Sequence, residues 1–198
     1  MTRRRPARRV IALMVLLAVL GGGWALIHRT MPSWYARFFY PLHYEHIIKQ
    51  EAKRYDLDPA LVAAVIKQES DWVPDERSQQ GAIGLMQLLP STARFVATQP
   101  RRPSPNPDRL DHPDVNIAYG TRYLRYLLDR YATVDAALVA YNGGEQNLIE
   151  WTRTAAAAGH AFRIPEDVPF TQTRDFVRGV RKSELIYRRA YAGRLRLG

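Results

Sequence analysis

The stretch AAVIKQES, residues 63–70, is an apolar segment that ends near a carboxylate, Glu69. A helix is predicted to begin just before it. Asp58 can cap the first free N–H groups, and Pro59 suits the first helical position, where its missing N–H is not needed. An apolar helix with a carboxylate in its last turn predicts either that the Glu69 carboxyl group is buried or that its side chain lies just outside the core.

The helical wheel places Glu69 within the apolar face. At about 100° per residue, Val65 and Ile66 lie near 40° and 140° from Leu61. Glu69 lies at about 80°, whereas Lys67 lies at about 240°, on the opposite face. If the apolar face packs inward, burial disfavours the ionised carboxylate, so Glu69 is expected to keep its proton near neutral pH and to serve as a general acid. The alternative is a glutamate that points into solvent or caps a neighbour.

The N-terminal part of the chain differs in composition from the rest. Residues 1–9 hold five arginines, and residues 10–27 are uncharged; this run of roughly 18 residues is near the minimum for crossing a bilayer. We therefore expect a basic cytoplasmic tail at 1–9, a single transmembrane signal anchor at 10–27 and an extracytoplasmic remainder. A cleaved signal peptide is the alternative, but neither a shorter apolar core nor a small-residue cleavage site is clear.

Residues 28–43 are rich in aromatic side chains. We interpret them as a stem that can lie at the lipid interface, or equally as a short hydrophobic segment packed on the domain. The aromatic residues concerned are Trp34, Tyr35, Phe38, Phe39 and Tyr40.

The composition of the chain excludes several classes of site and function. A chain of 198 residues, 46% hydrophobic and 24% charged, fits one globular domain with an appendage. The absence of cysteine excludes disulfides, thiolate metal sites and a cysteine nucleophile. Residues 1–43 hold seven of the 29 Lys and Arg and none of the 19 Asp and Glu, so the net charge of +10 falls to +3 for the remainder. A nucleic-acid-binding function is therefore not expected.

From residue 44 onward the apolar periodicity is helical, and an all-α domain is predicted over 44–192. Besides the helix that begins at Pro59, helices are expected at 44–55, 91–98, 115–131, 134–142, 145–158 and 173–191. Five prolines between Gln99 and Asn116 exclude a regular helix there. We expect a flexible flap within one domain rather than a boundary between two small ones.

Two further segments place polar groups beside apolar ones. In GAIGLMQLLPSTA, residues 81–93, Gly81 and Gly84 would let the backbone approach a ligand closely. Gln87 could offer its amide to a sugar hydroxyl or N-acetyl group.

The second segment is ALVAYNGG, residues 137–144, in which Tyr141 and Asn142 end an apolar helix before two glycines. This pattern places a phenol and an amide at a helix terminus. The simpler alternative is a buried tyrosine followed by an asparagine cap.

Five motifs occur in a characteristic order. They are ES at 69–70, GAIGLMQLLPSTA at 81–93, NIAYGTRYL at 116–124, AYNGG at 140–144 and VPFTQTRDFVRGV at 168–180. Together they resemble the soluble-type (SLT) lytic transglycosylase family, whose fold is goose-lysozyme-like, over about residues 43–191. The resemblance implies a lysozyme-like helical domain that cuts peptidoglycan glycan strands between N-acetylmuramic acid and N-acetylglucosamine and leaves 1,6-anhydromuramoyl ends.

By position, the resemblance implies that Glu69 is the catalytic acid and that Tyr141 is the phenol that hydrogen-bonds it. The implied substrate-binding residues are Ser70, Gly84, Met86, Gln87, Asn142 and Gln172. Neither a metal nor another cofactor is expected. His43 and His46 can share a helix face, but no third ligand accompanies them.

The sequence departs from the family pattern in its later motifs. Gln172-Thr173 stands where Glu-Thr is common, and Phe176 stands where a tyrosine is common. AYNGGEQ replaces AYNAGPG, which keeps the Tyr-Asn pair but places Glu145 nearby. Gln172 can still hydrogen-bond a sugar, but a role that needs a carboxylate there is lost.

The implied chemistry needs one carboxyl group, which gives its proton to the glycosidic oxygen and then accepts one from the muramoyl O6 hydroxyl as that oxygen attacks C1. A hydrolytic, lysozyme-like muramidase is the first alternative, because a second carboxylate could activate water. The candidates for that carboxylate are Asp71, Asp75, Glu76 and Glu145. A non-catalytic peptidoglycan-binding scaffold is the second alternative.

Overall fold

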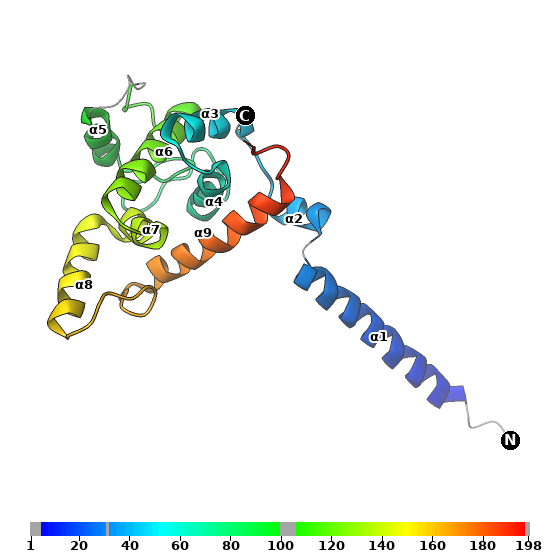
Figure 1. Cartoon of the computed structure of the whole chain (residues 1–198). Coiled ribbons are helices and arrows are strands. Elements are labelled where there is room, and N and C mark those ends of the chain that lie inside the picture. Colours follow the sequence, from blue (N-terminus) through cyan, green and yellow to red (C-terminus); the bar gives the residue numbers. More distant parts are fainter. Residues whose placement is uncertain (1–4, 31, 100–105, 197–198) are drawn as a thin grey trace. The chain divides into compact units, whose positions relative to one another are not determined.

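The computed structural model describes residues 5–30, 32–99 and 106–196. The chain divides into two compact units, Met1–Pro41 and Leu42–Gly198 (Figure 1). The first unit contains helix α1 (Arg5–Thr30) and helix α2 (Ser33–Phe39). All of the predicted site residues belong to the second unit.

Helix α1 does not meet the requirements of a membrane span, so the predicted transmembrane signal anchor at residues 10–27 is wrong. In the part of the chain that the structure describes, no helix combines the length and the apolar character needed to cross a bilayer. Three positions of the predicted span, Gly21, Gly22 and Gly23, are glycines, which add no apolar surface.

The single-pass topology depended on that span and loses its basis with it. The same holds for the cytoplasmic assignment of residues 1–9, of which residues 1–4 lie outside the described part of the chain.

In α2 the aromatic rings contact one another, with Tyr35 and Phe39 centroids 4.7 Å apart. Trp34 and Phe38 are exposed. The role of residues 28–43 as a stem stays a prediction.

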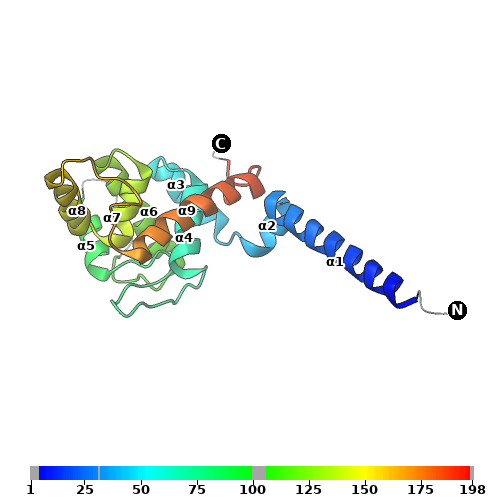
Figure 2. The same ribbon diagram turned by 90° about the horizontal axis from the view of Figure 1, so that it is seen from below.

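The second unit contains the seven described helices α3 to α9, and the predicted all-α domain is confirmed. Their bounds are α3 Glu45–Tyr55, α4 Pro59–Ser70, α5 Pro90–Thr98, α6 Pro113–Arg130, α7 Val134–Gly143, α8 Glu145–Ala157 and α9 Thr171–Ala190. Helix α9 packs along α4, while α6 contacts α3, α5 and α7 (Figures 1 and 2). The described strand-like pairing consists of two isolated bridges in the segment 77–88.

Helix α4 forms the centre of this unit. Every residue from Pro59 to Ile66 is buried, which is the pattern of a helix enclosed by its neighbours rather than of one with a single apolar stripe. The predicted N-cap is confirmed, because the Asp58 carboxylate accepts a hydrogen bond of 2.7 Å from the Ala60 N–H. In the last turn Lys67 and Glu69 are partly exposed and Gln68 is exposed, so Glu69 lies where one side of the central helix reaches the surface of the core.

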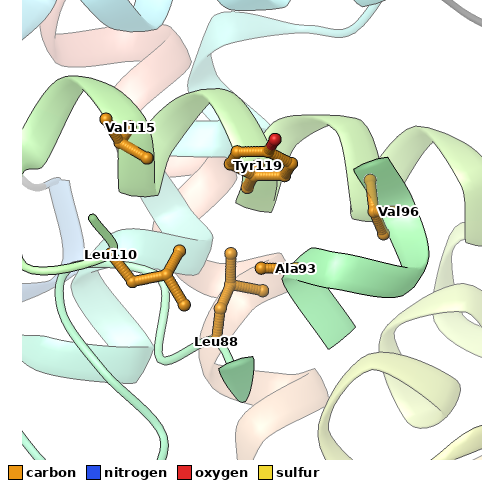
Figure 3. Packing of buried hydrophobic residues seen from close by; sticks show 6 residues of the cluster. All are labelled: Leu88, Ala93, Val96, Leu110, Val115 and Tyr119. Carbon is orange, nitrogen blue, oxygen red and sulfur yellow. The ribbon is translucent and has the colours of Figure 1, made fainter. Parts of the chain in front are cut away.

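A second apolar cluster supports the segment that follows α4. Figure 3 shows Leu88 between Leu110 and Ala93, facing Tyr119 of α6. Of the expected flap, residues 100–105 lie outside the described part of the chain, and α6 already begins at Pro113. Leu110 is buried in the cluster, so this part of the proline-rich segment is packed against the domain.

Candidate active site

A groove of about 860 Å³ opens where five segments of the second unit meet. These are the C-terminal end of α4, residues 76–92, α6 at Tyr123, the C-terminal end of α7 and the start of α9. The lining residues are Gln68, Glu69, Glu76, Ser78, Gln80, Ala82, Gln87, Leu88, Leu89, Thr92, Tyr123, Tyr141, Asn142, Gly143, Gly144, Phe170, Gln172, Thr173, Asp175 and Phe176. None of these described lining residues is Lys, Arg or His, so the groove offers no cation to a carboxylate.

Glu69 lies in this groove with a carboxyl group that is largely withdrawn from water. Its side chain is partly accessible, and the accessible part faces the groove. Burial raises the pKa of Glu69 to about 8, and a hydrogen bond from Asn142 opposes this rise. Burial is the larger effect, because taking a carboxylate out of water without a cation favours the neutral form. Glu69 therefore carries a proton at neutral pH that it can donate.

Asn142, predicted to bind substrate, contacts the acid itself. The Thr173 hydroxyl donates a hydrogen bond of 2.9 Å to the Asn142 side-chain oxygen. The amide nitrogen is then available to Glu69, with which Asn142 is hydrogen-bonded. An N–H donated to a carboxyl group stabilises its ionised form. Sequence reasoning left Thr173 without a role.

The phenol of Tyr141 donates its hydrogen to the groove wall. Its hydroxyl donates a hydrogen bond of 2.8 Å to the Met86 carbonyl oxygen. A phenol has a single hydrogen to donate, but its oxygen can also accept one, so a hydrogen bond from the protonated Glu69 carboxyl to this oxygen stays a prediction. Burial, and after it the nearby Glu69, raise the pKa of Tyr141. The ring lies nearly parallel to that of Phe176, at an angle of 9° with centroids 6.3 Å apart.

Three predicted substrate contacts lie behind the groove wall and do not line it. Ser70 is buried and its hydroxyl donates 2.9 Å to the Leu85 carbonyl. Gly84 has a φ of +78°, and a Cβ there would lie 2.4 Å from the Asn116 amide nitrogen. The missing side chain of Gly84 therefore permits the close approach of a neighbouring helix rather than that of a ligand. Met86 is fully buried. These residues shape the wall.

Asn116 of α6 holds that wall in place and was not singled out as a site residue. Its side-chain oxygen accepts 2.8 Å from the Met86 N–H, and its nitrogen donates to the carbonyls of Ile83 at 2.7 Å and Leu110 at 2.9 Å. The side chain is 1% exposed. An amide among buried apolar neighbours in the NIAYGTRYL motif is the signal that could have identified it, because such a group needs partners.

Gln87 and Gln172 are the two predicted glutamine contacts that line the groove. The Gln87 side-chain nitrogen donates to the carbonyl oxygens of Glu76 at 3.0 Å and Gly84 at 2.9 Å. Since both carbonyls can only accept, the amide nitrogen faces them and the side-chain oxygen remains as an acceptor for a ligand. Gln172 lies exposed in the first turn of α9.

Two other carboxylates line the groove, Glu76 and Asp175, and both are exposed. Glu76 was among the four candidates for a second carboxylate, whereas Asp175 was not. The remaining candidates, Asp71, Asp75 and Glu145, do not line the groove. The structure thus brings together Glu69, Asn142, Tyr141, Gln87 and Gln172 around one cleft.

Comparison with known proteins identifies the family of this chain. The sequence model of the transglycosylase SLT domain matches residues 46–162, more than half of the chain. The chain belongs to the transglycosylase SLT domain family. The predicted family is therefore confirmed, and the match includes Glu69 and Asn142 but ends before α9.

Relatives of the SLT domain found here include much longer proteins. The soluble lytic murein transglycosylase of Salmonella typhimurium is 32% identical over 151 residues, which cover 75% of this chain and 23% of the relative. The transglycosylase of Enterobacteria phage PRD1 is 39% identical over 110 residues, covering 56% of this chain and 38% of the phage protein.

Among solved structures, an inactive mutant of the lytic transglycosylase Slt from Pseudomonas aeruginosa superimposes with a TM-score of 0.67 and 28% identity. The alignment covers 80% of this chain and 26% of that one. The chain thus spans about a quarter of the length of these two bacterial relatives.

Proposed function

We propose that this SLT domain is a peptidoglycan lytic transglycosylase in which Glu69 is first the acid and then the base. The observation that carries the proposal is the position of Glu69. It is a carboxyl group facing a groove of about 860 Å³, with a pKa raised to about 8 by burial. The names of the relatives support the same reaction, since they include murein transglycosylases.

In the proposed reaction, the Glu69 proton passes to the glycosidic oxygen as the bond from that oxygen to C1 of the muramoyl sugar breaks. The resulting carboxylate takes the proton of the O6 hydroxyl while O6 forms a new bond to C1. The product is a 1,6-anhydro ring, no water is consumed, and Glu69 ends protonated as it began.

Other groups of the groove suit a neutral, hydroxyl-rich ligand. The Gln87 side-chain oxygen can accept from an O–H or an N-acetyl N–H, and Asn142 stabilises the carboxylate stage of Glu69. Tyr123 and Phe170 line the groove and offer apolar faces to sugar rings. Because peptidoglycan lies outside the cytoplasmic membrane, this function requires an extracytoplasmic location.

Hydrolysis by a lysozyme-like muramidase is the second candidate, because Glu76 and Asp175 line the same groove. Either carboxylate could direct a water molecule at C1. The product separates the two reactions, since hydrolysis leaves a reducing muramoyl end that is heavier by one water.

The test is incubation of the full chain with purified peptidoglycan, followed by mass spectrometry of the released ends. The variants are Glu69→Gln and, as a matched control, Glu150→Gln on the exposed surface of α8. Anhydromuramoyl ends from the wild type and the control, but not from Glu69→Gln, are expected. Reducing ends would show a muramidase, and binding without cleavage by the wild type would show a scaffold.

A further inference from the structure

The Asn142 side chain lies between a hydroxyl group and the proposed catalytic acid. Asn142 is in the last turn of α7, and Thr173 is in the first turn of α9 (Figure 1). The Thr173 hydroxyl donates to the Asn142 oxygen at 2.9 Å, and the Thr173 side chain is 2% exposed. Both helix ends border the groove that contains Glu69.

The approach of the two helices is close. A Cβ at Gly143 would lie 3.2 Å from the Thr173 methyl carbon and 3.3 Å from its hydroxyl oxygen. The glycine therefore permits the close approach of the end of α7 to Thr173, whose hydroxyl is bonded to Asn142. A buried hydroxyl in such a tight contact has few alternative partners.

An amide has an accepting oxygen and a donating nitrogen on opposite branches. Because the Thr173 hydroxyl occupies the oxygen of Asn142, the nitrogen is turned the other way, and Asn142 is hydrogen-bonded to Glu69. We propose that Thr173 is a positioning residue that holds the Asn142 amide with its nitrogen toward Glu69 and thereby stabilises the carboxylate that Glu69 becomes after donating its proton. The inference rests on the proposed function of Glu69 and adds a residue beyond the matched range 46–162.

The surroundings of Glu69 make this contact consequential. Facing the groove are the phenols of Tyr123 and Tyr141 and the exposed carboxylates of Glu76 and Asp175. None of them can neutralise a carboxylate at Glu69. On α4 itself, Lys67 is paired with Asp71. The hydrogen bond from Asn142 is the contact that opposes the rise in the Glu69 pKa caused by burial.

The test is an NMR titration of the Glu69 carboxyl carbon in the full chain, with Thr173→Val against the wild type. Loss of the hydroxyl frees the Asn142 amide, so the titration midpoint should rise by about one pH unit, the size expected for loss of one hydrogen bond to a carboxylate. Thr173→Ser keeps the hydroxyl and should restore the wild-type midpoint. Thr152→Val, the same replacement at an exposed position of α8, should leave the midpoint unchanged.

A double-mutant cycle separates this route from a general disturbance. Asn142→Leu alone should raise the midpoint as Thr173→Val does, and combining the two should add nothing further, because both remove the same donor. An unchanged or lower midpoint in Thr173→Val, or an additional shift in the double variant, would overturn the proposal. If Thr173→Val does not fold, Thr173→Ala takes its place with the same expected shift.

The titration needs no catalysis, so its outcome is independent of the proposed reaction. A wild type that releases no anhydromuramoyl ends would remove the proposed function while leaving the positioning of Asn142 measurable. In an active protein, the alkaline limb of the kcat/KM profile should move upward with the same variants that raise the midpoint.

Discussion

Two glutamates of the second unit, on α4 and α9, are both largely withdrawn from water, yet their surroundings are opposite. Glu184 is 4% exposed and its carboxylate accepts hydrogen bonds from Arg181 at 2.6 Å and Arg188 at 2.7 Å. Glu69 has the Asn142 amide and a groove without lining cations. Burial alone therefore does not make a carboxyl group reactive. Burial without a compensating cation does, because the group then keeps a proton that it can give away.

Glu69→Gln should produce the largest effect, a loss of lytic activity of about a thousandfold, because the amide cannot donate and retake a proton. The rate of release of soluble fragments from purified peptidoglycan measures it. Glu184→Gln, assayed well below its unfolding temperature, should still release the same product. An activity of Glu69→Gln within tenfold of the wild type would remove the distinction between the two glutamates.

The pH dependence of stability should distinguish Glu69 from an ordinary glutamate. The folded state holds the Glu69 proton up to a pKa of about 8, whereas an unfolded chain releases it near pH 4.3. Between these values the unfolded state binds fewer protons, so the wild type loses stability as pH rises. The unfolding temperature of Glu69→Gln should therefore exceed that of the wild type at pH 8, with a much smaller difference at pH 4. A difference that does not grow with pH would contradict the raised pKa.

Glu184→Gln should lower the free energy of unfolding by about 1–2 kcal/mol, because two guanidinium groups lose their shared charge partner. Both arginines are about half exposed, at 47% and 53%, so water reduces the loss below that of a fully buried pair. Urea unfolding at pH 7 measures it, with Glu150→Gln as the exposed control. A neutral or stabilising effect would show that the ion pairs on α9 do not hold the fold.

Gln172→Glu should have the smallest effect, a change in kcat/KM of less than about threefold at pH 7. The side chain is exposed in the first turn of α9, so water screens a new charge there. Steady-state kinetics on a soluble glycan fragment measure it. A tenfold gain would show that the reaction needs a carboxylate at this position, as the family pattern suggests.

The helices were predictable because their signals are local. The Asp58 cap and the apolar periodicity after it lie within one segment, and the expected helix at 134–142 is found at Val134–Gly143. The position of Glu69 follows from the same periodicity. The N-terminal span was predicted from an uncharged run, but among the described residues no helix is long and apolar enough to cross a membrane.

The support of the site was not predictable, because it depends on contacts between distant segments. Tyr141 binds the Met86 carbonyl across 55 residues, and Asn116 binds the Met86 N–H across 30. Thr173 reaches Asn142 across 31 residues. Local patterns indicate which residues are polar and which are buried, but only the packing of α4, α6, α7 and α9 decides which polar groups meet.

The most direct measurement of the central claim is the titration of the Glu69 carboxyl carbon by NMR in the wild-type chain. A midpoint near pH 8 is predicted, since burial without a cation raises the pKa to about 8. A midpoint between pH 4 and 5, the range of an ordinary glutamate, would contradict the assignment of Glu69 as the acid of this groove.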